Sequence, residues 1–276
     1  MELEDLVIGL VGGGNMARAL IRGLLKAGHA ASRLHVADPD PAQLEEVAAI
    51  HSGITIHADN HKVAALADVL VMAVKPQLMP AVSQAVGGAT RRPDQLVVSV
   101  AAGITLASLG EWFGAGTPIV RVMPNQPATI GAGMSCLAAS PAVGSGQRAM
   151  ALYIAASTGR ALWLADESLM DAVTAVSGSG PAYFYLLMEC MERAAVDLGL
   201  SPEVAAILTR ETALGAARVV SEQQAEPARL RAAVTSPGGT TAAAVQVFEA
   251  AHLDAIVGRA LAAARDRSLE LGQARR

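Results

Sequence analysis

A glycine-rich segment near the start of the chain places the strongest constraint on its fold. Residues 12–17 read GGGNMA and fit the pattern G-x-G-x-x-A, with Gly12, Gly14 and Ala17 at the three small positions. The segment follows a short apolar run that ends at Val11, and it opens a helical pattern. A strand, tight turn and helix in this order are typical of the first unit of a doubly wound sheet, where the turn holds a dinucleotide pyrophosphate. A merely flexible turn is the alternative.

The rest of the chain divides into two patterns. Short apolar runs at 34–37, 69–74, 96–100 and 119–122 alternate with helical patterns, which indicates βαβ units and a parallel sheet. From Glu167 onward only helical patterns remain, separated by Gly, Pro and Ser turns. We therefore expect a doubly wound, mainly parallel α/β Rossmann domain over residues 1–163 and an all-α domain over residues 164–276.

The helical part carries more apolar surface than one domain of its size can bury. The chain is 52% hydrophobic and 17% charged, and the helix expected over 203–220 is apolar on much more than one stripe. A helix that is apolar nearly all round is normally interior. This pattern predicts burial against a second copy of the chain, and hence a homodimer formed by the helical domain.

Charge and hydropathy exclude several classes of partner. The net charge is −4 and no basic cluster is dense, so we expect no nucleic acid partner. No apolar run has membrane-spanning length, and the first residues are acidic where a signal peptide is basic. Cys136 and Cys190 lack ligand spacing and are expected as small buried side chains in a reducing compartment. These features predict a cytoplasmic protein with no membrane partner.

The histidines give no indication of a metal site. The six of them show no spacing typical of zinc ligands, and all are expected in loops or on the surface. They are His29, His35, His51, His57, His61 and His252.

Two charged residues follow predicted strands at positions that suit a nucleotide. Asp38 lies 24 residues beyond Gly14, where a carboxylate can bind the adenosine ribose hydroxyls and repel a 2′-phosphate. Asp38 and Asp40 are alternatively only turn and cap residues. Lys75 precedes a proline at the end of another strand and can reach cofactor or substrate, or is an ordinary surface lysine. Arg121 is as easily structural as functional.

Two small-residue segments of the helical part suggest close approach of a ligand. Residues 177–183 read SGSGPAY, where small residues allow tight approach of a ligand, although helix packing alone can also require them. Residues 234–242 read VTSPGGTTA, a turn that opens a helix with backbone N–H groups and hydroxyls together. Such a helix start suits a small carboxylate. A dinucleotide motif followed by this feature indicates a reductase of a small acid.

Taken together, these segments resemble the pyrroline-5-carboxylate reductase family over nearly the whole chain. The segments are GGGNMA (12–17), AVKP (73–76), VAAG (100–103), RVMPN (121–125), SGSGPAY (177–183) and TSPGGTT (235–241). The resemblance implies reduction of the cyclic imine L-1-pyrroline-5-carboxylate to L-proline by NADPH or NADH, the last step of proline biosynthesis. It also implies a helical domain that interleaves with a partner's to form dimers, which assemble into larger rings.

The resemblance also implies site residues by position. Cofactor contacts are expected from Val11, Gly12, Gly13, Gly14, Asn15, Met16, Asp38, Asp40, Asn60, Ala73, Val74, Lys75, Pro76, Val100, Ala101 and Ala102. Substrate contacts are expected from Glu167, Ser236, Gly239, Thr240 and Thr241, with Thr241 as the first candidate for catalysis and Lys75 as the second. Many members carry an arginine for the 2′-phosphate shortly after the second strand, where this chain has Pro39. The choice between NADH and NADPH therefore stays open.

Three other functions use similar features. β-Hydroxyacid dehydrogenases share the glycine motif and a helical second domain, but they need a lysine on the long helix, and this chain has none after Lys75. An unrelated imine reductase would use similar chemistry. A non-catalytic metabolite sensor would keep the cofactor fold with degraded substrate loops, whereas the 235–241 segment is intact.

Overall fold

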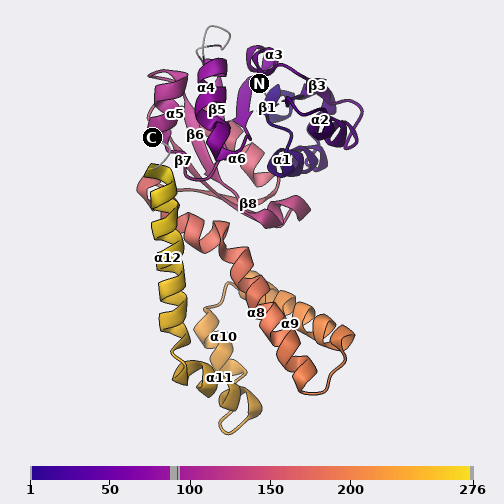
Figure 1. Cartoon of the computed structure of the whole chain (residues 1–276), viewed down its shortest axis with the longest axis vertical. Coiled ribbons are helices and arrows are strands. Elements are labelled where there is room, and N and C mark those ends of the chain that lie inside the picture. Colours follow the sequence, from indigo (N-terminus) through magenta and orange to yellow (C-terminus); the bar gives the residue numbers. More distant parts are fainter. Residues whose placement is uncertain (1, 88–91, 93, 274–276) are drawn as a thin grey trace. The chain divides into compact units, whose positions relative to one another are not determined.

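The computed structural model describes residues 2–87, 92 and 94–273 of the chain (Figure 1). Contacts divide the chain into two compact units. The first consists of Met1–Ser179 together with Ala264–Arg276, and the second of Gly180–Ala263. In the described residues, no helix is long and apolar enough to cross a membrane.

The first unit is built on one sheet of eight strands. The strands are β1 (Ile8–Val11), β2 (Leu34–Ala37), β3 (Thr55–His57), β4 (Val69–Met72), β5 (Leu96–Ser99), β6 (Ile119–Met123), β7 (Gly133–Ala139) and β8 (Gly159–Trp163). Their order is β3-β2-β1-β4-β5-β6-β7-β8. All neighbouring pairs are parallel except β6 and β7. The doubly wound, mainly parallel Rossmann sheet predicted from the sequence is confirmed.

Helices cover both faces of this sheet, because its central strands are apolar on both sides. The helices of this unit are α1 (Asn15–Lys26), α2 (Pro41–Ala48), α3 (Asn60–Leu66), α4 (Met79–Gly87), α5 (Leu106–Phe113), α6 (Ser145–Ala156) and α7 (Met170–Val173). One core cluster joins the strands to α1 and α6, with Leu20 and Ile154 among its members. The other joins them to α3, α4 and α5, with Val63 and Leu109 among its members. Residues of β1, β4, β5 and β6 are buried throughout, as expected for a sheet covered on both faces.

Strand register places three loops side by side. Val11 pairs with Ala37 on one side and with Met72 on the other. The chain therefore leaves β1, β2 and β4 at the same level, at their carboxyl ends. Ligands of open α/β sheets bind at this edge.

The second unit is entirely helical in the part of the chain that the structure describes. Its helices are α8 (Gly180–Asp197), α9 (Pro202–Gln223), α10 (Pro227–Ala233), α11 (Thr240–Ala250) and the first half of α12 (Leu253–Gln273). Ser201 caps α9 through the N–H of Val204, and Pro202 occupies its first turn, as the sequence predicted.

Large apolar side chains of this second unit remain exposed in the single chain. They lie on α8, α9, α11 and α12 and include Phe184, Leu187, Ile207, Leu208, Phe248 and Ile256, which are each 45–64% exposed. This matches the expectation from the 203–220 pattern that the helices need a partner. Many exposed large apolar side chains on a few helices are typical of an interaction surface.

Two expectations about individual side chains are wrong. Cys136 is buried as expected, but Cys190 is exposed in the single chain. The reason is that Cys190 lies on α8, where only Gly180 is buried within one chain. His29 is buried with only 2% exposure, and the half-buried His35 and His57 lie within strands β2 and β3 rather than in loops. Burial lowers the pKa of His29 and His35 below the ordinary value; His29 lies in the interior, whereas His35 is half-buried.

Candidate active site

A cavity of about 460 Å³ lies at the carboxyl edge of β1, β2 and β4. It brings together many of the residues expected to bind the cofactor, from four separate segments of the chain. These are Gly12, Gly14, Asn15, Asp38, Asp40, Asn60, Ala73, Val74 and Lys75.

The glycine turn provides the close approach that a dinucleotide needs. Gly12 has a φ of +100°, and a Cβ there would lie 2.7 Å from the carbonyl oxygen of Ala73. At Gly14 a Cβ would meet nothing within 4 Å, so the space above it is open. Helix α1 begins at Asn15 without a side-chain cap, which leaves its first-turn N–H groups for a ligand. The turn therefore fits a pyrophosphate group.

Asp38 lines the cavity and also holds the turn in place. One carboxylate oxygen accepts the N–H of Gly13 at 2.7 Å, and the other accepts the N–H of Asp40 at 2.9 Å. Asp40 in turn caps α2 by accepting the N–H of Ala42 at 3.0 Å. Both residues thus make the turn and cap contacts that the sequence allowed, while their side chains remain in the cavity lining.

Five lining residues were not anticipated from the sequence: Arg18, Pro39, Gln43, Leu78 and Val82. Arg18 is the charged one. Its Nη1 donates to the carbonyl of Gly13 at 3.3 Å and to Oε1 of Gln43 at 2.9 Å, and its Nη2 donates to Oδ1 of Asn15 at 2.7 Å. The sequence contained an indication of this, because Arg18 lies four residues after Gly14, which places it one helical turn beyond the glycine turn.

The remaining expected cofactor residues are not part of the cavity lining. They are Val11, Gly13, Met16, Pro76, Val100, Ala101 and Ala102. The main chain of Gly13 is held by two hydrogen bonds: its N–H donates to Asp38, and its carbonyl accepts from Arg18. Lys75 is exposed, and its extended ψ of 144° is the conformation expected before a proline.

Glu167 forms a polar cluster away from this cavity. Its Oε1 accepts Nη1 of Arg121 at 2.9 Å and the N–H of Leu106 at 2.8 Å. Arg121 is only 3% exposed, so the carboxylate neutralises a buried cation and fills the N-terminus of α5. Next to it, hydrogen bonds from the side chain and backbone of Ser168 lower the pKa of Asp166. The sequence did not decide whether Arg121 is structural or functional. Its ion pair with Glu167 gives it a structural role.

The 234–242 segment of the second unit forms a turn that opens α11. Gly238 has a φ of +71°, and Gly239 donates its N–H to the carbonyl of Ser236 at 3.0 Å. A Cβ on Gly239 would lie 2.5 Å from Oγ of Ser236, so a larger residue here would require the Ser236 side chain to rotate away. Helix α11 then begins at Thr240 without a side-chain cap. The exposed Thr240 and Thr241 present first-turn N–H groups and hydroxyls together.

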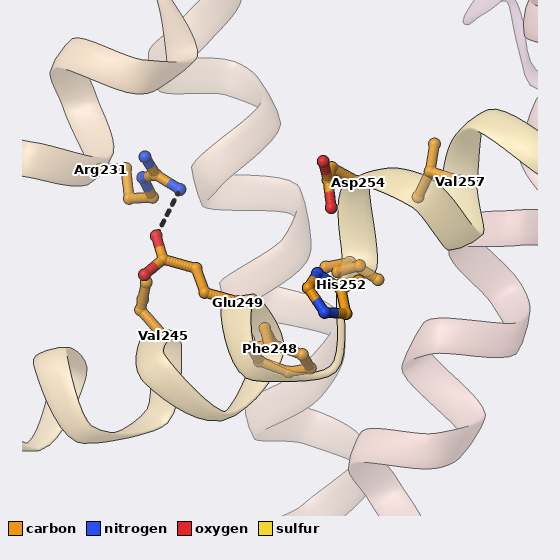
Figure 2. Close-up of a pocket in the computed structure, with 8 residues that line it drawn as sticks. Arg231, Val245, Phe248, Glu249, His252, Asp254 and Val257 are labelled. Carbon is orange, nitrogen blue, oxygen red and sulfur yellow. Dashed lines mark ion pairs between the residues drawn. The ribbon is translucent and has the colours of Figure 1, made fainter.

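A second cavity, of about 730 Å³, lies in the same unit and contains none of the expected site residues (Figure 2). Phe248, Val245 and Val257 supply apolar lining, and Arg231 pairs with Glu249 at 3.5 Å (Figure 2). Both partners of this ion pair are more than half exposed, so it adds little stability. Within the described residues no group of three or more His, Cys, Asp or Glu side chains could hold a metal ion.

Comparison with known families assigns both parts of the chain. Residues 167–271 match a family model described as pyrroline-5-carboxylate reductase dimerisation. Residues 7–103 match one described as NADP oxidoreductase coenzyme F420-dependent. The pyrroline-5-carboxylate reductase of Pseudomonas aeruginosa is 48% identical over 96% of this chain and 97% of its own length. That of Haemophilus influenzae is 40% identical over 98% of each chain.

Solved structures agree with this assignment. A pyrroline-5-carboxylate reductase from Coxiella burnetii has a TM-score of 0.92 at 38% identity, covering 96% of this chain and 98% of its own. Plasmodium falciparum pyrroline carboxylate reductase with NADP bound has a TM-score of 0.87 at 29% identity, covering 98% and 100%. A 3-hydroxyisobutyrate dehydrogenase from Mycobacterium tuberculosis, at 17% identity and a TM-score of 0.51, shares the fold alone. The chain belongs to the pyrroline-5-carboxylate reductase family.

Proposed function

We propose that this chain reduces L-1-pyrroline-5-carboxylate to L-proline with NADPH or NADH. The observation that carries the proposal is the near-full-length match to a curated pyrroline-5-carboxylate reductase at 48% identity. The nucleotide cavity of the first unit and the open start of α11 in the second supply the two binding features that such a reaction needs.

The residues of the first cavity would hold the cofactor. The uncapped start of α1 and the space above Gly14 suit its pyrophosphate. Asp38 and Asn60 line the part of the cavity formed after β2 and β3, and Lys75 lies after β4, where it would position cofactor or substrate. When bound, the reduced nicotinamide supplies the hydride that the imine carbon accepts. The protein itself would orient the cofactor and the imine and place charged and hydrogen-bonding groups around them.

The start of α11 would hold the substrate. Because the N–H of Gly239 is donated to Ser236, we assign the carboxylate to the N–H groups of Thr240 and Thr241, with Gly239 providing the space in front of them. The Thr241 hydroxyl would hydrogen-bond the ring nitrogen. As the C=N bond becomes CH–NH, C5 gains a hydride and the nitrogen ends with one proton, whose delivery this hydroxyl assists. Ser236 and Glu167 remain proposed neighbours of the substrate.

The apolar faces of α8, α9, α11 and α12 are proposed to form the dimer. The dimerisation model covers this region, and its exposed apolar side chains need a partner. We further propose that dimers assemble into rings, that the functional domains divide at 163/164, and that the protein works in the cytoplasm, where its two free cysteines stay reduced.

The experiment that tests the function is direct. Purified protein is given NADPH or NADH with synthetic L-1-pyrroline-5-carboxylate, and cofactor oxidation and proline formation are followed together. Oxidation that depends on the imine and yields equimolar proline supports the proposal. Cofactor binding without imine-dependent turnover would instead indicate a sensor, and turnover only with other imines would indicate a different reductase.

A further inference from the structure

Arg18 is a cation in the lining of the nucleotide cavity, and none of the described residues forms an ion pair with it. Its guanidinium donates hydrogen bonds to uncharged oxygens of Gly13, Gln43 and Asn15. Among the residues that the structure describes, no carboxylate forms an ion pair with it. A guanidinium has five N–H donors and three are used, so the Nε–H and one N–H of Nη2 remain for a ligand.

The contacts of Arg18 fix its position within the cavity. Gln43 belongs to the first turn of α2, which follows the loop of Asp38 and Asp40. The hydrogen bond from Arg18 to Gln43 therefore places the guanidinium beside the loop after β2. That loop meets the adenosine ribose in sheets of this kind, rather than the nicotinamide end.

The carboxylate of Asp38 is already stabilised by the main chain. Each of its two oxygens accepts a backbone N–H, from Gly13 at 2.7 Å and from Asp40 at 2.9 Å. The N–H dipoles point their positive ends at the carboxylate and so offset part of its field. The repulsion that Asp38 would exert on a 2′-phosphate is thereby reduced, whereas no carboxylate of the described residues forms an ion pair with Arg18.

We propose that Arg18 binds the 2′-phosphate of NADPH and makes this chain favour NADPH over NADH. The inference rests on the proposed function, since it assumes that the cavity takes a nicotinamide dinucleotide. Arginine suits the role because its planar fork matches a phosphate group and keeps its charge at any physiological pH. The recognition residue then lies on α1, in place of the position after β2 that Pro39 occupies.

The test measures binding of four nucleotides to the full-length protein by titration calorimetry. Two carry the 2′-phosphate (NADPH and adenosine 2′,5′-bisphosphate), and two do not (NADH and adenosine 5′-monophosphate). In Arg18→Gln we expect roughly ten- to hundredfold weaker binding of the first two, with the other two within about threefold of wild type. Arg18→Lys keeps the positive charge without the planar guanidinium, so its affinity for the two 2′-phosphate nucleotides should fall less. This variant also keeps the test possible if Arg18→Gln does not fold.

Arg22 provides a matched control on the same helix. It lies four residues further along α1 and lines a different cavity, together with Lys26. Arg22→Gln removes the same charge from α1 and should leave the ratio of NADPH to NADH affinity unchanged.

Several outcomes would overturn the inference. Equal weakening of all four nucleotides by Arg18→Gln would mean that Arg18 contacts the pyrophosphate or only supports the turn. Unchanged binding would remove it from the site, and an equal loss in Arg22→Gln would reduce the effect to general charge. If the wild-type protein binds neither NADPH nor NADH, the proposed function itself fails. If the wild-type protein binds them and Arg18→Gln leaves the ratio of NADPH to NADH affinity unchanged, only the role of Arg18 is refuted.

Discussion

The cluster of Glu167, Arg121 and Leu106 permits a quantitative prediction about stability. Glu167→Ala removes one carboxylate oxygen that accepts two hydrogen bonds, at 2.9 and 2.8 Å. It leaves a buried guanidinium and a helix N–H without this partner. A hydrogen bond to a charged group contributes about 1.5–3 kcal/mol, so two would contribute about 3–6 kcal/mol if the site were dry. Because the Glu167 side chain is 26% exposed, water replaces part of the loss.

We therefore expect Glu167→Ala to lower the free energy of unfolding of the first unit by about 2–3 kcal/mol. For a unit of this size that corresponds to a fall in Tm of roughly 4–12 °C. Glu167→Gln keeps an acceptor oxygen and should lower the free energy by about 1 kcal/mol.

Tryptophan fluorescence during thermal and urea unfolding measures this directly. The two tryptophans are Trp112 and Trp163, and both lie in the first unit. Trp112 belongs to α5, the helix whose first N–H Glu167 accepts.

The control is Glu270→Ala, which breaks the exposed ion pair with Arg267 in the part of α12 that belongs to the first unit and should lower stability by at most about 0.5 kcal/mol. If Glu167→Ala unfolds within about 0.5 kcal/mol of wild type, the reasoning is wrong. Glu167 would then act at the substrate alone.

Three further predictions concern the glycine turn at residues 12–14, the start of α11 and the pH dependence of stability. Gly12→Ala should abolish nucleotide binding and lower Tm, because its Cβ would lie 2.7 Å from a main-chain carbonyl at a φ of +100°; calorimetric titration that finds wild-type affinity would contradict this. Thr241→Ala should reduce kcat by about 10²–10³ with cofactor Kd unchanged, and wild-type kcat would remove the hydroxyl from the mechanism. Burial lowers the pKa of His29, His35 and His57, so the unfolded chain binds protons at a higher pH than the folded one. Stability should be full above about pH 6.5 and fall as the pH drops below it; His29→Gln should flatten this slope in urea titrations, and an unaltered slope would exclude His29 as a contributor.

The parts of the fold that depend on local pattern could be predicted from the sequence. The apolar run at 34–37 is strand β2 at the same residues, and Asp40 caps α2 ahead of Pro41 as expected. Three strands were missed for physical reasons. β3 has three residues at the sheet edge and lacks buried alternation, and β7 consists largely of small residues, whose strand preference is low. β8 lies at the other edge of the sheet, and it has no β-branched residue and no fully buried position.

The parts of the site that depend on tertiary contacts could not be predicted in the same way. The glycine turn follows from backbone conformation, which the residue types specify. The contact of Arg18 with Gln43 joins α1 to α2, and it depends on how two helices face each other. The burial of His29 likewise depends on its contact with Tyr153, 124 residues away in the chain. The expected site residues and the boundary at 163/164 stay predictions.

The central claim is that the start of α11 binds the carboxylate of a small cyclic substrate. A crystal structure of the protein with L-proline and the oxidised cofactor tests it most directly. We predict the proline carboxylate within hydrogen-bond distance of the N–H groups of Thr240 and Thr241, and its ring nitrogen next to the Thr241 hydroxyl. Proline bound elsewhere, with these N–H groups facing water or the protein, would contradict the account.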